Sequence, residues 1–246
     1  MTYIEGFIVP VPTANRETYR KHANEAWSIF EDFGTQRLVE AWGDDVQDGQ
    51  VTDLKRAVQL KPEETVVFSW FEYADKAARD AANIKMREDP RMKEMGANMP
   101  FDAQRMIYGG FKVVDEQGEQ GKMGYAEGML APISADRLDE LGAFSAKSSA
   151  LFIEYGATRV VEGIEDDVPE GKVTDFHRAV QKKEGEKVVF SWIEWPSKEV
   201  RDEAWPKIMA DERMRASPMP WDMQRMTTGG FEPIVDTRVR QLETTD

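Results

Sequence analysis

Several charged residues of this chain recur in pairs and could perform acid–base chemistry. The pairs are Glu5 with Glu127, Glu72 with Glu194, and Arg105 with Arg225. An ionised carboxylate among aromatic side chains is costly unless it has a cationic partner, so these groups should have either a raised pKa or an arginine beside them. A carboxylate with a raised pKa could act as a general base on a small organic substrate, and an arginine could stabilise the resulting oxyanion. Structural salt bridges at the strand ends are the alternative, and the residues leave both open.

Aromatic side chains accompany these carboxylates along the predicted strands. They could line an apolar ligand pocket, and the candidates are Tyr3, Phe68, Trp70, Tyr108, Tyr125, Phe190 and Trp192. Packing between two sheets would use the same residues. The sequence does not decide between a pocket and a core.

The composition limits metal and cofactor chemistry. The chain has no cysteine, and its two histidines, His22 and His177, align with Phe144 and Lys55. A histidine-ligated site would therefore have to be asymmetric. We expect no cofactor: neither haem, nor flavin, nor a tightly bound transition metal.

These recurrences belong to one long internal duplication. Residues 3–10 return as 125–132, and 66–72 return as 188–194, each 122 positions later. The offset becomes 120 where 99–102 matches 219–222, so the second copy lacks two residues before that point. Each copy is long enough to form a domain with its own core.

Hydrophobic periodicity predicts strand, helix, strand, strand, helix and strand in each copy. In the first copy, strands are expected over 3–9, 37–44, 66–73 and 105–113, with helices after Thr13 and over 75–88. Thr13 and Ser134 are the expected helix N-caps. Pro206 should kink the second helix of the second copy.

This order predicts an α+β fold of two tandem ferredoxin-like βαββαβ repeats. The third strand of each copy is apolar on both faces, so the two sheets should meet through the faces that helices leave uncovered, forming an intramolecular pseudo-dimeric α/β barrel. The expected units are a first repeat over 1–114, a linker over 115–122, a second repeat over 123–236 and a loose tail over 237–246.

A net charge of −14 disfavours nucleic acid and anionic membrane surfaces as partners. No apolar stretch approaches the roughly 20 residues that a membrane-spanning helix needs. We expect a cytoplasmic protein whose partner is a small organic ligand, and self-association is compatible with the sequence.

Several motifs in a fixed order resemble the YbaA-like family, a domain of unknown function (1428). They are Tyr-x-Glu-Gly-Phe, Asp-Asp-Val-x-x-Gly-x-Val-Thr, Arg-Ala-Val-Gln, Phe-Ser-Trp-x-Glu, Met-Pro-Phe-Asp and Arg-Met-x-x-Gly-Gly-Phe. The resemblance covers nearly all of both copies. It implies the dimeric α/β-barrel superfamily, here as a tandem fusion. That superfamily includes cofactor-free monooxygenases, isomerases, haem enzymes and non-catalytic stress proteins, so the fold does not choose an activity.

Two classes of function therefore stay open. One is binding of a small organic molecule, with cofactor-independent acid–base chemistry, between sheet and helices or between the two sheets. The other is a non-catalytic stress or interaction protein with a packed inter-sheet core. Any pocket should differ between the copies, because His22, Asn83 and Tyr108 align with other residue types. Residues 99–111 should line the better site.

Overall fold

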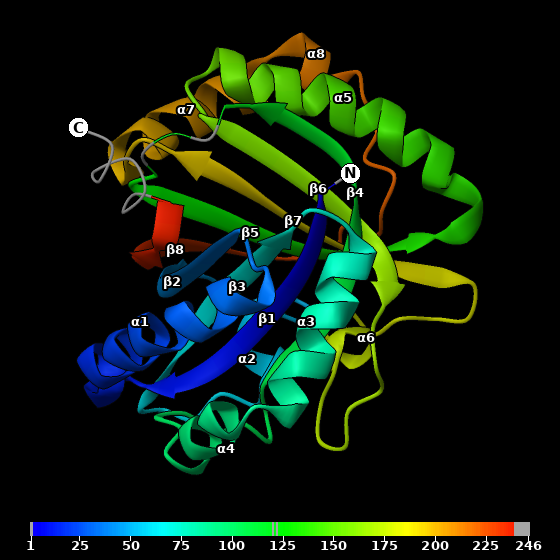
Figure 1. The fold of residues 1–246 in the computed structure, drawn as a ribbon. Helices are drawn as coiled ribbons and strands as arrows, with labels where there is room; N and C mark the ends of the chain where they lie inside the picture. The colour runs from blue at the N-terminus through cyan, green and yellow to red at the C-terminus, as the bar shows by residue number, and fades with distance from the viewer. Residues whose placement is uncertain (1, 120, 122, 239–246) are drawn as a thin grey trace.

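Eight antiparallel strands close into one barrel in the computed structural model, which describes residues 2–119, 121 and 123–238 (Figure 1). The strands are β1 (Tyr3–Pro12), β2 (Arg37–Val46), β3 (Glu64–Tyr73), β4 (Ile107–Gly118), β5 (Tyr125–Ser134), β6 (Arg159–Asp167), β7 (Glu186–Trp195) and β8 (Thr227–Asp236). Their order around the barrel is β1-β3-β2-β8-β5-β7-β6-β4. Each repeat thus contributes four adjacent strands, which confirms the predicted pseudo-dimeric α/β barrel.

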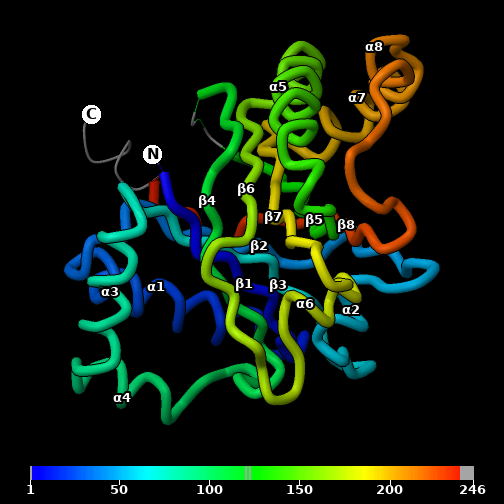
Figure 2. The backbone as a smooth tube through the Cα atoms, turned by 90° about the vertical axis from the view of Figure 1, so that its right-hand side faces the viewer, coloured from blue at the N-terminus to red at the C-terminus, as the bar shows by residue number. Residues whose placement is uncertain are grey.

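The longer helices lie outside the barrel, and those of the two repeats occupy different sides of it (Figures 1 and 2). The longer helices are α1 (Arg16–Phe33), α3 (Lys76–Glu88), α4 (Pro90–Ala97), α5 (Leu138–Glu154) and α7 (Lys198–Ala210). The four-residue helices are α2 (Leu54–Ala57), α6 (Phe176–Ala179) and α8 (Glu212–Arg215). Of these short helices, α2 and α6 lie beside each other. Within the described part of the chain, no helix has both the length and the apolar character required to cross a membrane.

The N-terminal caps of the first helices differ from the prediction. A 3₁₀ turn over Thr13–Asn15 precedes α1. No side-chain hydrogen bond caps the N-terminus of this turn or the N-terminus of α1. The Thr13 hydroxyl instead donates to the carbonyl of Glu63, and Ser134 makes no capping hydrogen bond. The predicted caps are therefore wrong, since the 3₁₀ turn separates these hydroxyls from the α-helical amides. Pro206 lies inside α7, which continues to Ala210.

Two strand pairs between the repeats close the barrel. β2 pairs with β8, and β4 pairs with β6, where Gly118 lies opposite Arg159. β4 therefore includes residues 115–118, which were predicted as linker; the ladder to β6 supplies the partners that keep this polar segment extended. Of the predicted tail, residues 239–246 lie outside the described part, whereas Thr237 is buried and accepts a hydrogen bond from the Leu38 amide.

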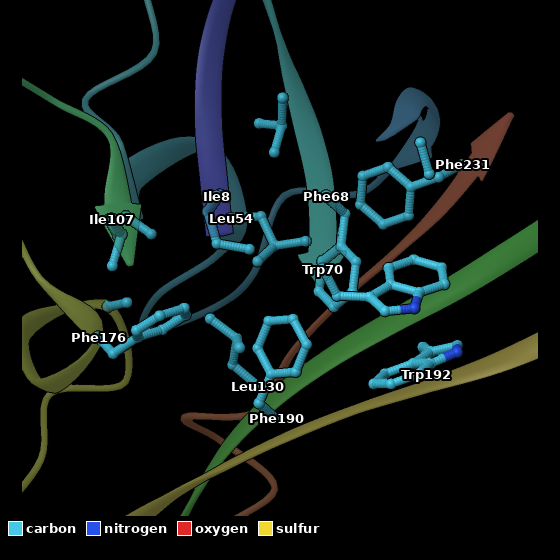
Figure 3. Close-up of a cluster of buried hydrophobic side chains, with 14 of the residues drawn as sticks. Ile8, Leu54, Phe68, Trp70, Ile107, Leu130, Phe176, Phe190, Trp192 and Phe231 are labelled. Atoms are coloured by element: carbon cyan, nitrogen blue, oxygen red, sulfur yellow. The ribbon is translucent and has the colours of Figure 1, made fainter. Parts of the chain in front are cut away.

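The barrel interior is packed with aromatic rings from both repeats (Figure 3). Phe68 stacks on Phe190 with ring centroids 4.7 Å apart, and Trp70 stacks on Trp192 at 4.5 Å. All four side chains are buried. The space between the two sheets is thus a shared hydrophobic core.

One end of this core holds a buried charge cluster, which we define as Arg37, Glu72, Arg159 and Glu194. Arg37 lies 2.7 Å from Glu194 and 3.2 Å from Glu72. Arg159 lies 2.7 Å from Glu72 and 3.1 Å from Glu194. Each arginine thereby binds carboxylates of both repeats. Asp236 and Glu116 complete the coordination of Arg37 and Arg159, respectively.

The Glu-Gly pair near the start of each repeat places a glycine directly against an aromatic ring of the other repeat. A Cβ atom on Gly6 would lie 2.6 Å from the Phe190 ring, and one on Gly128 would lie 2.6 Å from the Phe68 ring. Both contacts are shorter than any ordinary carbon–carbon contact. Glycine at these positions therefore allows the stacked phenylalanines to fit.

Gly6→Ala should accordingly lower the free energy of unfolding by about 1–3 kcal/mol, the usual effect of overpacking a core. Urea denaturation measures the change. Gly142→Ala is the control, because that helical position is open and alanine there should add about 0.5–1 kcal/mol. Equal, small effects of the two substitutions would contradict the interlocking of the repeats.

Glu72→Leu should destabilise the fold by about 3–5 kcal/mol, because it leaves buried arginine charge without its partner. Asp48→Asn, in an exposed salt bridge with Lys55, should leave stability nearly unchanged. Chemical denaturation of both variants provides the comparison. A small effect of Glu72→Leu would show that the cluster does not hold the repeats together.

Candidate functional site

Each repeat has a cavity between the outer face of its sheet and its helices. The first-repeat cavity is lined by β1, β2, β3, α1, α3, α4 and residues 99–108, and its volume is about 520 Å³. The second-repeat cavity occupies the corresponding place, with a volume of about 100 Å³. These volumes confirm the prediction that the pockets of the two repeats differ. Residues 99, 101, 106 and 108 do line the larger one.

Glu40 is a buried carboxyl that lines the first-repeat cavity. Side chains alternate along β2, so Glu40 points away from the barrel core, and only 6% of it is exposed. The Tyr19 hydroxyl on α1 donates to its Oε2 at 2.7 Å. Burial raises the pKa of Glu40 to about 7, although hydrogen bonds from Tyr19 and Ser69 act in the opposite direction. At neutral pH this carboxyl can therefore either accept or release a proton.

Glu5 lies in the wall of the same cavity but is held in an ion pair. Arg79 of α3 approaches its Oε1 at 3.0 Å, and the Asn83 amide donates to that oxygen at 3.2 Å. Burial raises the pKa of Glu5, and the charge of Arg79 partly offsets this. Arg79 also binds Asp167 on β6, so this wall is anchored to the second repeat.

The rest of the cavity wall is apolar and adaptable. Five methionines line it, namely Met86, Met92, Met95, Met99 and Met106. Flexible thioether side chains suit irregular ligands. Half-buried His22 also lines the cavity, and burial lowers its pKa, so its imidazole is neutral at neutral pH. Tyr108, which is 46% exposed, lies at the opening.

Larger side chains fill the corresponding space in the second repeat. Trp205 stands where the first repeat has Asn83, Phe144 where it has His22, and Trp221 where it has Phe101. Trp205 donates to Glu127 at 2.7 Å, as Asn83 does to Glu5. The fold thus retains the hydrogen bond while the indole occupies the cavity.

The other predicted catalytic residues lie elsewhere. Glu72 and Glu194 belong to the buried charge cluster; burial raises the pKa of Glu72, but Arg159 and Arg37 outweigh that effect and the net pKa is lowered. Arg105 binds Glu64 at 2.6 Å and Asp102 at 2.8 Å.

Arg225 repeats the Arg105 arrangement with Glu186 and Asp222. Neither arginine is among the residues that line the two cavities. Each instead joins the start of the last strand of its repeat to the start of the third.

The predicted ligand-binding aromatics also separate into groups. Phe68, Trp70 and Phe190 pack within the barrel, and Trp192 does so while contributing to the wall of the second-repeat cavity. The hydroxyl of Tyr3 binds Asp166, and that of Tyr125 binds Asp44, so these two tyrosines join the repeats. Tyr108 is the member of the predicted set that lines the first-repeat cavity.

Sequence reasoning did not select Glu40, Tyr19 or His22 as site residues. The available signal was a carboxylate in the middle of an otherwise apolar strand, residues 38–42. His22 was not selected because it aligns with Phe144 and its position does not recur. Its failure to recur instead reflects the difference between the two cavities.

Among the described residues, no cluster of three or more histidine, cysteine or acidic side chains is arranged to hold a metal ion. The chemistry of the first-repeat cavity is thus that of a buried carboxyl, a phenol, an imidazole and thioethers.

Comparison with known protein families assigns the chain to one of them. The family described as "Protein of unknown function (DUF1428)" matches residues 2–103 and again residues 124–223. The chain belongs to this family. The two matches coincide with the two repeats, so the protein contains the family's domain twice.

Relatives with a single copy are shorter. "Uncharacterized protein YbaA" of Escherichia coli strain K12 is 54% identical over 117 residues, which are 47% of this chain and 100% of the relative. The YbaA protein of Shigella flexneri matches to the same extent.

Solved structures share the fold at low sequence identity. A "putative monooxygenase" from Fusobacterium nucleatum has a TM-score of 0.59 at 10% identity, covering 96% of this chain and 93% of that one. A second "putative monooxygenase", from Lactobacillus acidophilus, has a TM-score of 0.58 at 8% identity, covering 96% and 95%. An "anthrone oxidase-like protein" reaches 0.53 at 11% identity, covering 96% and 92%. These likenesses establish the dimeric α/β-barrel fold.

The raised pKa of Glu40 predicts a specific pH dependence of stability. The unfolded carboxyl loses its proton near pH 4.5, whereas the folded one keeps it until about pH 7. The folded state therefore binds more protons in this window, and stability falls as the pH rises through it. Relative to Glu40→Gln, the wild type should lose about 3 kcal/mol between these pH values.

Urea denaturation of the wild type and of Glu40→Gln across pH 4–8 measures the difference between their free energies of unfolding. The contributions of Glu162 and of all other titrating groups are the same in both proteins and cancel in this difference. Parallel stability curves would show that Glu40 titrates normally.

Proposed function

We propose that the first-repeat cavity binds a small, mainly apolar organic molecule that carries a carbonyl or phenolic group, and that Glu40 exchanges a proton with it. The observation that carries this proposal is the position of Glu40: a buried carboxyl with a pKa of about 7 forms the base of an open cavity of about 520 Å³. A general base is most effective when its pKa lies near the working pH.

The cavity provides the groups that such a reaction needs. The Glu40 carboxylate would remove a proton from the carbon next to a carbonyl group, and the electron pair would move onto the carbonyl oxygen. His22 and Asn83, which line the cavity, have N–H groups that could donate to the resulting enolate. Return of the proton from Glu40 to the same or a conjugated carbon gives exchange or isomerisation without oxidation or reduction.

The structural neighbours are compatible with this class of ligand. Their printed descriptions are "putative monooxygenase" and "anthrone oxidase-like protein". An anthrone has an acidic CH₂ group that is conjugated with its carbonyl through the aromatic rings, and a base such as Glu40 would remove a proton from a group of this kind. At identities of 8–11% these descriptions support the kind of substrate and not its identity.

The alternative function is a non-catalytic stress or interaction protein. The tightly packed barrel interior agrees with that hypothesis, which expected Trp70 and Trp192 to fill the space. The cavity lies outside the barrel, however, so the packed interior does not compete with ligand binding. The open first repeat favours the small-molecule proposal, in a cytoplasmic protein that acts on a metabolite.

A thermal-shift screen with small aromatic ketones and phenols tests binding, since a ligand that binds only the folded state raises its melting temperature. The variant His22→Phe with Asn83→Trp gives the first cavity the residues of the second. We expect ligands to stabilise the wild type and not this variant. The second repeat accommodates the same residues, so the variant should fold. Equal stabilisation of both proteins would place the ligand elsewhere.

Proton exchange tests the chemistry. The best-stabilising ketone is incubated with protein in D₂O, and loss of its α-proton signal is followed by NMR. Glu40→Gln should bind the ketone but slow the exchange by about 100-fold or more. The matched control is Glu203→Gln, an exposed glutamate on α7, which should exchange at the wild-type rate. If the wild type binds the ketone but its α-proton exchanges no faster than without protein, the proposed proton transfer by Glu40 is wrong and only the ligand binding stands.

A further inference from the structure

The second repeat retains a buried glutamate in an unusual setting. Glu162 on β6 aligns with Glu40 and is only 6% exposed. Leu141 replaces the tyrosine that binds Glu40 in the first repeat. Among the described residues, Glu162 Oε1 has no hydrogen-bond partner. A buried polar atom without a partner is costly, and this one belongs to the wall of the second-repeat cavity.

A second polar group of the same wall is also without a partner. Trp221 lines the cavity, and its buried indole N–H donates to no atom of the described residues. The other walls are apolar and come mainly from Phe144, Phe152, Trp205 and Met214. The second-repeat cavity is therefore a small apolar space with polar groups at defined positions.

Burial and nearby negative charge both favour the protonated form of the Glu162 carboxyl. Asp115 on β4 is the nearest acidic influence, and Glu127 on β5 lies in the same cavity wall, paired with Arg201 of α7. Burial first, and the Asp115 charge second, raise the pKa of Glu162 to about 8. At neutral pH Glu162 is thus an uncharged carboxylic acid that can donate a hydrogen bond.

We propose that the second-repeat cavity is a separate binding site for a small, neutral, single-ring molecule with one hydrogen-bond acceptor, which the carboxylic acid of Glu162 holds. The volume of about 100 Å³ is of the order that accommodates one small ring in an apolar protein cavity. An anion would meet Glu127 and Asp115. A pure hydrocarbon would leave the acid proton of Glu162 without an acceptor.

This site differs in chemistry from the first-repeat cavity. There, Tyr19 donates to Glu40, so the carboxyl acts as an acceptor and base. Here, Leu141 cannot donate, so the carboxyl acts as a donor. The proposal concerns a different cavity and does not depend on the reaction assigned to Glu40.

Pyridine and benzene are suitable probes, because they have the same shape and only pyridine accepts a hydrogen bond. Each is titrated at pH 6.5 into ¹⁵N-labelled protein carrying His22→Phe and Asn83→Trp, which fills the first cavity. The Trp221 indole N–H resonance, assigned with Trp221→Phe, reports on binding. We expect both to shift this resonance, with pyridine binding about 3- to 10-fold more tightly.

Two comparisons test the role of Glu162. Glu162→Met keeps the side-chain length without the donor and should abolish the preference for pyridine while benzene still binds. In protein that keeps Glu162, the preference for pyridine over benzene should also disappear as the pH rises from 6.5 to 9.5, because the carboxylic acid of Glu162 loses its proton.

Several outcomes would overturn the proposal. The first is that neither probe binds, as expected if water alone occupies the cavity. The second is that pyridine and benzene bind with equal affinity at pH 6.5. The third is that the preference for pyridine persists in Glu162→Met. The pH comparison remains decisive even if Glu162→Met fails to fold.

Discussion

The closed barrel depends on one arrangement of buried charges. Arg37 and Arg159 each bind carboxylates from both repeats, Glu72 and Glu194, at distances of 2.7–3.2 Å. Four charges out of water are tolerable only because each has oppositely charged partners in good geometry. The tryptophan rings beside them complete the arrangement, as Trp70 and Trp192 donate to Glu72 and Glu194. The fold therefore uses buried carboxylates to join its halves, and aromatic rings of both repeats pack in the barrel interior.

That constraint places any ligand on the other face of the sheet. Residues alternate between the two faces of each strand, so the side chains next to those in the core point towards the helices. Glu5 and Glu40 are on this outer face, where methionines and an imidazole lie among aromatic rings. Duplication then allows the two outer faces to differ. Trp205, Phe144 and Trp221 fill the second one without disturbing the barrel, because the barrel contacts lie on the opposite side of the same strands.

Much of the architecture could be predicted because it depends on local patterns that occur twice. The strand periodicity and the apolar third strand were sufficient to indicate the barrel. The helix entries were mispredicted because a 3₁₀ turn separates Thr13 from α1. The polar segment after Val113 was interpreted as linker because its strand partner, β6, lies more than 40 residues away in the sequence. Non-local pairing of this kind has no local signal.

The candidate site was predictable only in part. Alternation puts Glu5 on one strand face with Tyr3 and Phe7, but it could not show which face would be filled. Glu72 and Glu194 were chosen because they accompany tryptophans, and that neighbourhood proved to be the sign of a shared core. Glu40 also has a tryptophan, Trp42, two positions away, but its hydrogen-bond partner Tyr19 comes from a helix 21 residues earlier, so no local pattern distinguished it. Contacts between a strand and the helix that covers it depend on helix rotation, which periodicity defines only roughly.

The energetics of the four outer carboxyls separate structure from chemistry. Glu5 and Glu127 have arginine partners and contribute to anchoring α3 and α7. Within the described part of the chain Glu40 and Glu162 have no arginine partner, and burial raises their pKa values to about 7 and about 8. Keeping Glu40 ionised at neutral pH costs about 3 kcal/mol, and an apolar residue of similar size would avoid that cost. A group that destabilises the fold in its charged form, yet forms the base of an open cavity, is better explained by what it does to a ligand than by what it does for the fold.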